Sequence, residues 1–231
     1  MFNTLSEVAY EEILKRILRG EYGQGQSLTE DKLCKDLSMS RTPVREALKI
    51  LESEGIVKKN NRSFTVIYIT SDEVDKLYEV RIPLESTASK LAAIRATSED
   101  IQEMEAILKL VEEETYKDSP DPVKLADLNG QFHDKVAKSS SNPFLYSYLR
   151  EIRLKLRIVR LTLFTSFDRR MEELKEHREI FNAIKNRDPE GASEIMNLHE
   201  RNVLDYLRSK VVPILLSPSA SASSPLTKEK E

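Results

Sequence analysis

The stretch SRTPVREAL, residues 40–48, decides the fold of the N-terminal part of this 231-residue chain. Pro43 suits the first turn of a helix, where a backbone N–H has no intrahelical partner. Arg41 and Arg45 are one turn apart and share a face opposite the apolar residues Val44 and Leu48. An arginine fork can grip a guanine edge or clamp a phosphate. Taken alone, however, two arginines at this spacing are more often a solvated helix face, so DNA reading depends on the surrounding sequence.

The sequence on both sides predicts a winged helix-turn-helix. Apolar spacing predicts a first helix over Glu7–Arg19. Ser27–Glu30 has the S-x-x-E form of a capping box, which would start a second helix ending near Leu37, and Gly55 would end the third. Two stretches rich in β-branched residues predict the strands of a wing, joined by a polar hairpin. These segments are residues 56–58, 64–69 and, for the hairpin, 60–63.

Beyond Ser71 no strand pattern follows, so the fold class is mainly α. We expect a winged helix-turn-helix DNA-binding domain over 1–70 and an all-α helical bundle over 71–212. The last stretch, 213–231, is low in complexity and rich in Ser, Ala and Pro, and we expect a disordered tail. Helices are expected near 72–95, 98–116, 121–139, 143–164, 168–186 and 189–211.

Composition points to an intracellular protein. No stretch approaches the roughly 18 apolar residues that span a bilayer, so we expect no membrane association and a cytoplasmic location. The single cysteine, Cys34, allows no intrachain disulfide and is interpreted as a small core residue. The net charge is −3, yet residues 41–62 hold six basic and three acidic side chains. A local positive charge in an acidic chain is expected where one face meets phosphate.

The three histidines of the chain, His133, His177 and His199, each lie on an apolar helical stripe of a different expected helix. One such histidine is usually a core residue, but all three in this position indicate that they converge. Neutral imidazole is the commonest ligand for zinc-like ions, and three leave room for an oxygen ligand. Asn129 lies one turn before His133 on the same face.

Residues 8–69 resemble the DNA-binding domain of the GntR family. The resemblance implies that Arg41 and Arg45 contact bases or phosphates, and Ser40 and Thr42 add short donors for the DNA backbone. Two positions depart from the family pattern. Asp31 replaces a common basic or polar residue, and the wing tip has Asn61-Arg62-Ser63 where glycine is usual, so that Arg62 could reach into the minor groove. The matching segments are 25–30, 40–48 and 51–57.

The remaining chain resembles the FCD ligand-binding domain of the FadR subfamily of GntR regulators. The resemblance implies that Asn129, His133, His177 and His199 hold a divalent ion, zinc in the first place, with nickel and manganese as other candidates. Asn129 replaces the common aspartate and is a weaker, neutral donor. Arg81 would pair with an effector carboxylate that also binds the metal, or else form an ordinary surface salt bridge. The segments are 80–85, 129–133 and 176–184, with Ala192 and His199.

Together these features predict a dimeric transcription regulator, a repressor in the first place, whose affinity for a palindromic double-stranded operator changes with a small carboxylate effector. The coupling would pass through the first helix of the C-terminal domain. A metal-dependent hydrolytic enzyme is the alternative from another class. His199 and Glu200 are adjacent and would not share a helix face, so no general base is evident. A purely structural metal, or a regulator that senses the metal itself, also stays open.

Overall fold

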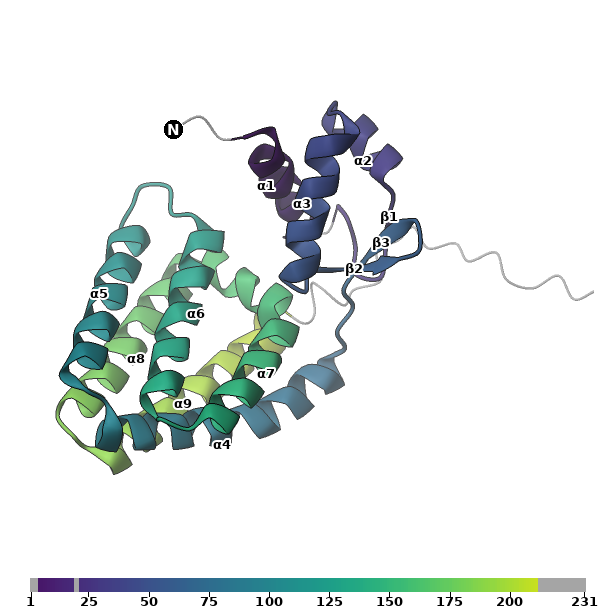
Figure 1. The fold of residues 1–231 in the computed structure, drawn as a ribbon. Coiled ribbons are helices and arrows are strands. Elements are labelled where there is room, and N and C mark those ends of the chain that lie inside the picture. Colours follow the sequence, from purple (N-terminus) through teal and green to yellow (C-terminus); the bar gives the residue numbers. More distant parts are fainter. Residues whose placement is uncertain (1–3, 19–20, 212–231) are drawn as a thin grey trace, which may run out of the picture.

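The computed structural model describes residues 4–18 and 21–211, and within them the expected mainly α class is confirmed (Figure 1). A small winged head lies against a larger bundle of antiparallel helices. The elements of the head are α1 (Leu5–Leu18), β1 (Ser27–Leu28), α2 (Glu30–Leu37), α3 (Arg41–Ser53), β2 (Val57–Asn60) and β3 (Ser63–Val66). The elements of the bundle are α4 (Ser71–Arg95), α5 (Ser98–Thr115), α6 (Pro122–Ser139), α7 (Pro143–Leu161), a 3-10 turn (Thr162–Thr165), α8 (Phe167–Lys185), α9 (Pro189–Tyr206) and a π-helical turn (Leu207–Val211).

The wing is a three-stranded antiparallel sheet in the order β1-β3-β2. The capping box expected at Ser27–Glu30 is wrong, because Ser27 pairs with Thr65 in β1. Thr29 instead caps α2 and accepts a hydrogen bond from the Lys32 backbone N–H. Pairing with β3 gives hydrogen-bond partners to the backbone groups of Ser27 and Leu28. These residues therefore form a strand and not the first turn of a helix.

The β2–β3 hairpin explains the missing glycine at the wing tip. Asn61 has a φ of 49°, in the left-handed region that asparagine tolerates better than most residues. Arg62 follows it at the exposed tip. The second strand ends at Val66 rather than at the expected Ile69.

Capping residues define the ends of the bundle helices. Thr70 and Thr97 form capping boxes at the starts of α4 and α5. Asp188 caps α9, and Pro189 occupies its first turn. The helix expected over 143–164 ends at Leu161 and continues as the 3-10 turn. The tail expected at 213–231 lies outside the described residues.

The head and the bundle share one apolar core. Buried side chains of the head, such as Ile13 and Leu48, belong to the same cluster as Tyr78 of α4 and Leu156 of α7. Cys34 is partly buried and packs against this cluster. Because the two parts are in contact, a change in the bundle can be transmitted to the head.

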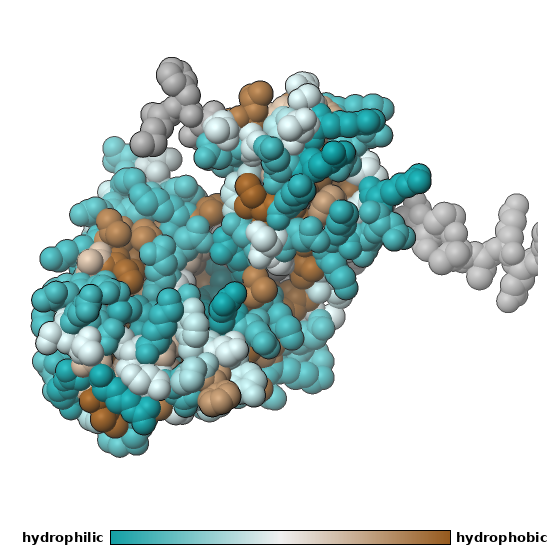
Figure 2. All heavy atoms as spheres, in the orientation of Figure 1, coloured by the Kyte–Doolittle hydropathy of each residue, from teal (hydrophilic) through white to brown (hydrophobic). Residues whose placement is uncertain are grey.

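The surface is mostly polar on the face drawn in Figure 2, with apolar side chains in small patches. Among the described residues, no helix is long and apolar enough to cross a membrane.

Candidate metal centre and DNA-reading helix

The three histidines converge on one point inside the bundle. His133 on α6, His177 on α8 and His199 on α9 are all buried. The Nε2 atom of His177 lies 3.2 Å from Nε2 of His133 and 3.3 Å from Nε2 of His199. The sequence-based prediction that they meet is therefore confirmed. We call these three side chains the metal centre.

The nitrogen separations match those of ligands around a single ion. Two imidazole nitrogens about 2.1 Å from a zinc-like ion, at coordination angles of about 90–109°, are about 3.0–3.4 Å apart. Three neutral imidazoles with facing lone pairs repel one another unless a cation or a shared proton lies between them. The donor set and its geometry thus fit a divalent ion.

Glu176 orients His199 from the far side of its ring. The Nδ1 atom of His199 lies 2.7 Å from a carboxylate oxygen of Glu176, which also pairs with Arg169 at 3.0 Å. Burial alone would raise the pKa of Glu176, but the hydrogen bond from His199 and the nearby charges lower it to about 2. The ionised carboxylate accepts the Nδ1 proton, so Nε2 of His199 presents its lone pair to the centre.

Burial also keeps the other two imidazoles neutral. It lowers the pKa of His133 well below the ordinary value, against the raising effect of Glu85. The pKa of His177 is lowered well below its ordinary value by burial and by the positive charge that the neighbouring histidines would carry. Neutral imidazoles are the form that binds metal.

Asn129 contributes an amide oxygen with no partner. Its Nδ2 donates a hydrogen bond to the Leu125 carbonyl at 2.8 Å, so the amide orientation is set by α6 itself. The Oδ1 atom is buried and has no hydrogen-bond partner. An unsatisfied buried acceptor is costly, and one turn from His133 it suits a cation ligand.

Arg81 is fully buried, so its interpretation as a surface salt bridge is wrong. Its guanidinium lies 3.2 Å from Glu85 and 2.8 Å from Glu200. Although burial opposes the charge of Arg81, the two carboxylates and Tyr78 raise its pKa. The guanidinium is thus already paired in the free protein.

Sequence reasoning missed Glu200. The expectation that Glu200 would not share the face of His199 is wrong, because both side chains are buried. A carboxylate oxygen of Glu200 lies 3.8 Å from Nδ1 of His133 and 4.0 Å from Nε2 of His199. The signal was available, because Glu200 stands four residues after Met196 and three before Val203 on the buried stripe of α9.

The start of α3 presents the expected DNA-reading residues to solvent. Ser40, Arg41, Thr42 and Arg45 are all exposed there, while Val44 and its neighbours on the other face are buried. The structure therefore groups these four residues, and it places Arg62 apart from them on the wing.

Acidic residues at the start of α2 hold both arginines in the free protein. Arg45 donates to both carboxylate oxygens of Glu30, at 2.9 and 2.7 Å. Arg41 pairs with Asp31 at 2.8 Å. Asp31 is therefore the counter-ion of Arg41, as Glu30 is of Arg45. Exposed pairs of this kind contribute little to stability, so DNA can replace them at small cost.

Two family models match the chain. One describes bacterial regulatory proteins of the gntR family and matches residues 5–67, and the other describes the FCD domain and matches residues 76–202. Both matched segments follow the division of the structure into head and bundle.

Known proteins are similar over most of the chain. The HTH-type transcriptional regulator YdhC of Bacillus subtilis strain 168 is 30% identical over 200 residues, which are 86% of this chain and 89% of the relative. The gluconate operon transcriptional repressor of Bacillus licheniformis is 27% identical over 212 residues, with coverages of 89% and 84%. The structure of E. coli McbR/YncC superposes with a TM-score of 0.63 at 22% identity, covering 90% of this chain and 98% of that one, which shows the shared fold. The relatives are transcription regulators, which decides against the hydrolytic enzyme.

Proposed function

The chain belongs to the GntR family of bacterial regulatory proteins and has an FCD domain, and from this we propose that it regulates transcription in response to a small organic acid bound at the metal centre. It is a DNA-binding regulator like its relatives, and repression is the proposed direction. The observation that supports the effector site most directly is the set of three buried imidazoles with Nε2 separations of 3.2 and 3.3 Å.

The ion is proposed to be held by His133, His177, His199 and Asn129. Zinc is the first candidate because imidazole nitrogen with one oxygen ligand suits it, while nickel and manganese are the other candidates. When bound, the ion would supply a Lewis-acidic position for a carboxylate. The role of the protein is to hold the imidazoles neutral and to fix their direction, as Glu176 does for His199.

The effector is proposed to be a small carboxylate. Arg81 would stabilise it, because a ligand carboxylate can share the guanidinium that Glu85 and Glu200 now hold. The name of the B. licheniformis relative refers to gluconate, a hydroxylated carboxylate, which supports this chemical class.

DNA is proposed to bind the head of each protomer of a homodimer, and the operator is then palindromic because it mirrors the two-fold axis. Ser40, Arg41, Thr42 and Arg45 would contact one major groove, and Arg62 the adjacent minor groove. The domain division is part of this proposal, with a DNA-binding unit over 1–70, an effector unit over 71–212 and a tail over 213–231. The site of action is the cytoplasm.

The test combines elemental analysis of the purified protein with a DNA titration. An operator fragment is first obtained by in vitro selection with the full chain. We expect one divalent ion per chain and an operator affinity that changes when citrate, as a probe of small carboxylates, is added to the metal-loaded protein. A protein purified without any ion, and unable to take up zinc, nickel or manganese, would contradict the metal centre.

A further inference from the structure

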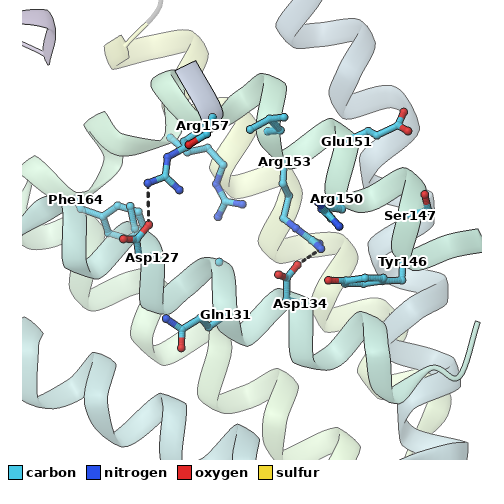
Figure 3. Close-up of a pocket in the computed structure, with 15 residues that line it drawn as sticks. Asp127, Gln131, Asp134, Tyr146, Ser147, Arg150, Glu151, Arg153, Arg157 and Phe164 are labelled. Atoms are coloured by element: carbon cyan, nitrogen blue, oxygen red, sulfur yellow. Dashed lines mark hydrogen bonds and ion pairs between the residues drawn. The ribbon is translucent and has the colours of Figure 1, made fainter. Parts of the chain in front are cut away.

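A cavity of about 800 Å³ lies between α6 and α7 and opens beside the head (Figure 3). Its α7 wall is formed by Arg150, Arg153, Arg157 and Arg160, which we call the arginine ladder. Their spacing of three, four and three residues puts them on one helix face. On the α6 wall, Gly130 has open space where a side chain would stand. The hollow between these helices is also visible in Figure 2.

The ladder is only partly neutralised. Arg157 pairs with Asp127 at 3.0 Å, and Arg153 pairs with Asp134 (Figure 3). Arg150 has no ion-pair partner among the described residues, and the buried Nε of Arg157 has no hydrogen-bond acceptor. Guanidinium groups prefer bidentate anionic partners, so the cavity suits an anion that could take the place of these carboxylates.

Two of these arginines contact residues that lie beside the metal centre and in the head. Arg153 lies 3.1 Å from Glu85, whose other oxygen is 3.4 Å from Nδ1 of His133. At the opposite end, Arg157 lies 3.3 Å from Glu54, the residue that caps the C-terminus of the reading helix α3. The ladder therefore connects the two sites that a regulator has to couple.

Glu54 is sensitive to the loss of Arg157. Burial raises the pKa of Glu54, while the charge of Arg157 and a 2.8 Å hydrogen bond from Tyr10 of α1 lower it. A half-buried carboxylate that loses its cation becomes unfavourable unless it can move towards water. If Arg157 moves away from Glu54, a different position of α3 relative to the bundle is therefore favoured. In the same region, the side chain of Leu154 packs against Gly55.

We propose that the effector is a polyanion with a second anionic group that binds the arginine ladder in this cavity, and that this group takes Arg157 from Glu54. The ligand class is a small molecule with two or more carboxylate groups, or with a carboxylate and a phosphate. This inference rests on the proposed function, because it places one carboxylate at the metal centre. It adds a second binding site and a route by which ligand binding affects α3. A ligand can shift the position of the head only if it binds one arrangement of head and bundle more tightly than the other.

The binding test uses the metal-loaded full chain and calorimetric titration with citrate, a tricarboxylate. We expect saturable binding that weakens at least about tenfold in Arg150→Gln and in Arg157→Gln, with the metal content unchanged. Lys155→Gln is the control, because it removes the same charge from α7 outside the cavity. Thermal melts of each variant exclude unfolding. Absence of saturable citrate binding, or equal binding by all three variants, would overturn the proposal.

The coupling test uses Glu54→Gln, which leaves every cavity arginine in place. We expect this variant to bind citrate normally, while citrate no longer changes its operator affinity. Tyr10→Phe, a milder change at the same carboxylate, should reduce the response in part. An undiminished response in Glu54→Gln would overturn the route through Arg157.

The two proposals fail in different ways. In one outcome, the double variant His177→Ala, His199→Ala loses citrate binding while the arginine variants keep it. The ligand then binds at the metal centre alone, and only the cavity proposal is refuted. If the arginine variants lose binding while the metal-free protein keeps it, the cavity proposal stands and the role of the metal falls.

Discussion

The Nε2 atoms of His133 and His177 face each other 3.2 Å apart in a buried site that brings α6 and α8 together with α9. Neither ring can be charged there at neutral pH without a large desolvation cost, because burial holds the pKa of each well below its ordinary value. Without an ion, the pair makes folding sensitive to pH.

The metal-stripped protein should therefore lose stability in mild acid. The pKa of both histidines is lower in the folded chain than in the unfolded one, where it is about 6.5. The unfolded state takes up protons first, so this stability is present above about pH 6.5 and is lost as the pH falls below it. Denaturant titrations should give a free energy of unfolding about 2–3 kcal/mol lower at about pH 5.5 than at about pH 7.5.

A variant that replaces both His133 and His177 by Asn serves as the control for this effect. Its stability should change less over the same range, because Glu176, with a pKa of about 2, titrates in stronger acid. Equal free energies of unfolding for the stripped wild type at both pH values would contradict the neutral state of the histidines.

Arg41→Ala and Arg45→Ala should each weaken specific operator binding by roughly 1–3 kcal/mol, because each removes a guanidinium that can contact a base. Both side chains are exposed and held only by exposed or half-exposed carboxylates, so DNA is free to capture them. The measurement is a titration at fixed salt. Lys109→Ala, an exposed charge on the bundle, should have no effect, and unchanged affinity of both arginine variants would remove their assigned role.

Arg62→Ala should weaken binding to all sequences and flatten its salt dependence. One lost phosphate contact lowers the slope of log K against log salt by about 0.9. Asn61 supplies the left-handed turn of the hairpin, so the substitution at its neighbour leaves the wing geometry intact. A salt slope identical to that of the wild type would mean that the wing is only a structural hairpin.

Asn129→Asp should tighten metal binding, because it replaces an unpaired amide oxygen by an anionic donor. Glu200→Gln should weaken it by about 10–100-fold, the usual effect of removing a charge next to the ligands. Competition with a fluorescent zinc chelator measures both changes. Equal affinities for all three proteins would show that these oxygens do not influence the ion.

Local patterns were enough to predict the histidine cluster. A histidine on the apolar stripe of a helix must point inward, and inward-facing residues of three packed helices can meet. The same logic placed Arg41 and Arg45 on the exposed face of α3. Pairings between distant segments were not available to such reasoning. Ser27 pairs with Thr65 in the sheet, although the residues next to Ser27 in the sequence predict that a helix starts there.

The burial of charged side chains was the second feature that the sequence analysis did not predict. Charged residues are rarely buried, so the place of Glu200 on the apolar stripe of α9 was not used as a signal, and Arg81 kept a surface salt bridge as its alternative. They are tolerated there because Arg81 lies between Glu85 and Glu200. The contact of Arg157 with Glu54 depends on how the head packs against the bundle. No local sequence pattern encodes this packing.

The most direct test of the account is a comparison of wild type with the double variant His177→Ala and His199→Ala. Metal content and operator affinity are measured for both, with and without citrate. We predict that the double variant contains no ion and binds the operator with nearly the wild-type affinity, because the reading residues lie on the head. Citrate should not change that affinity. A full effector response from the metal-free double variant would contradict the account and would leave the histidines as buried core residues of the bundle.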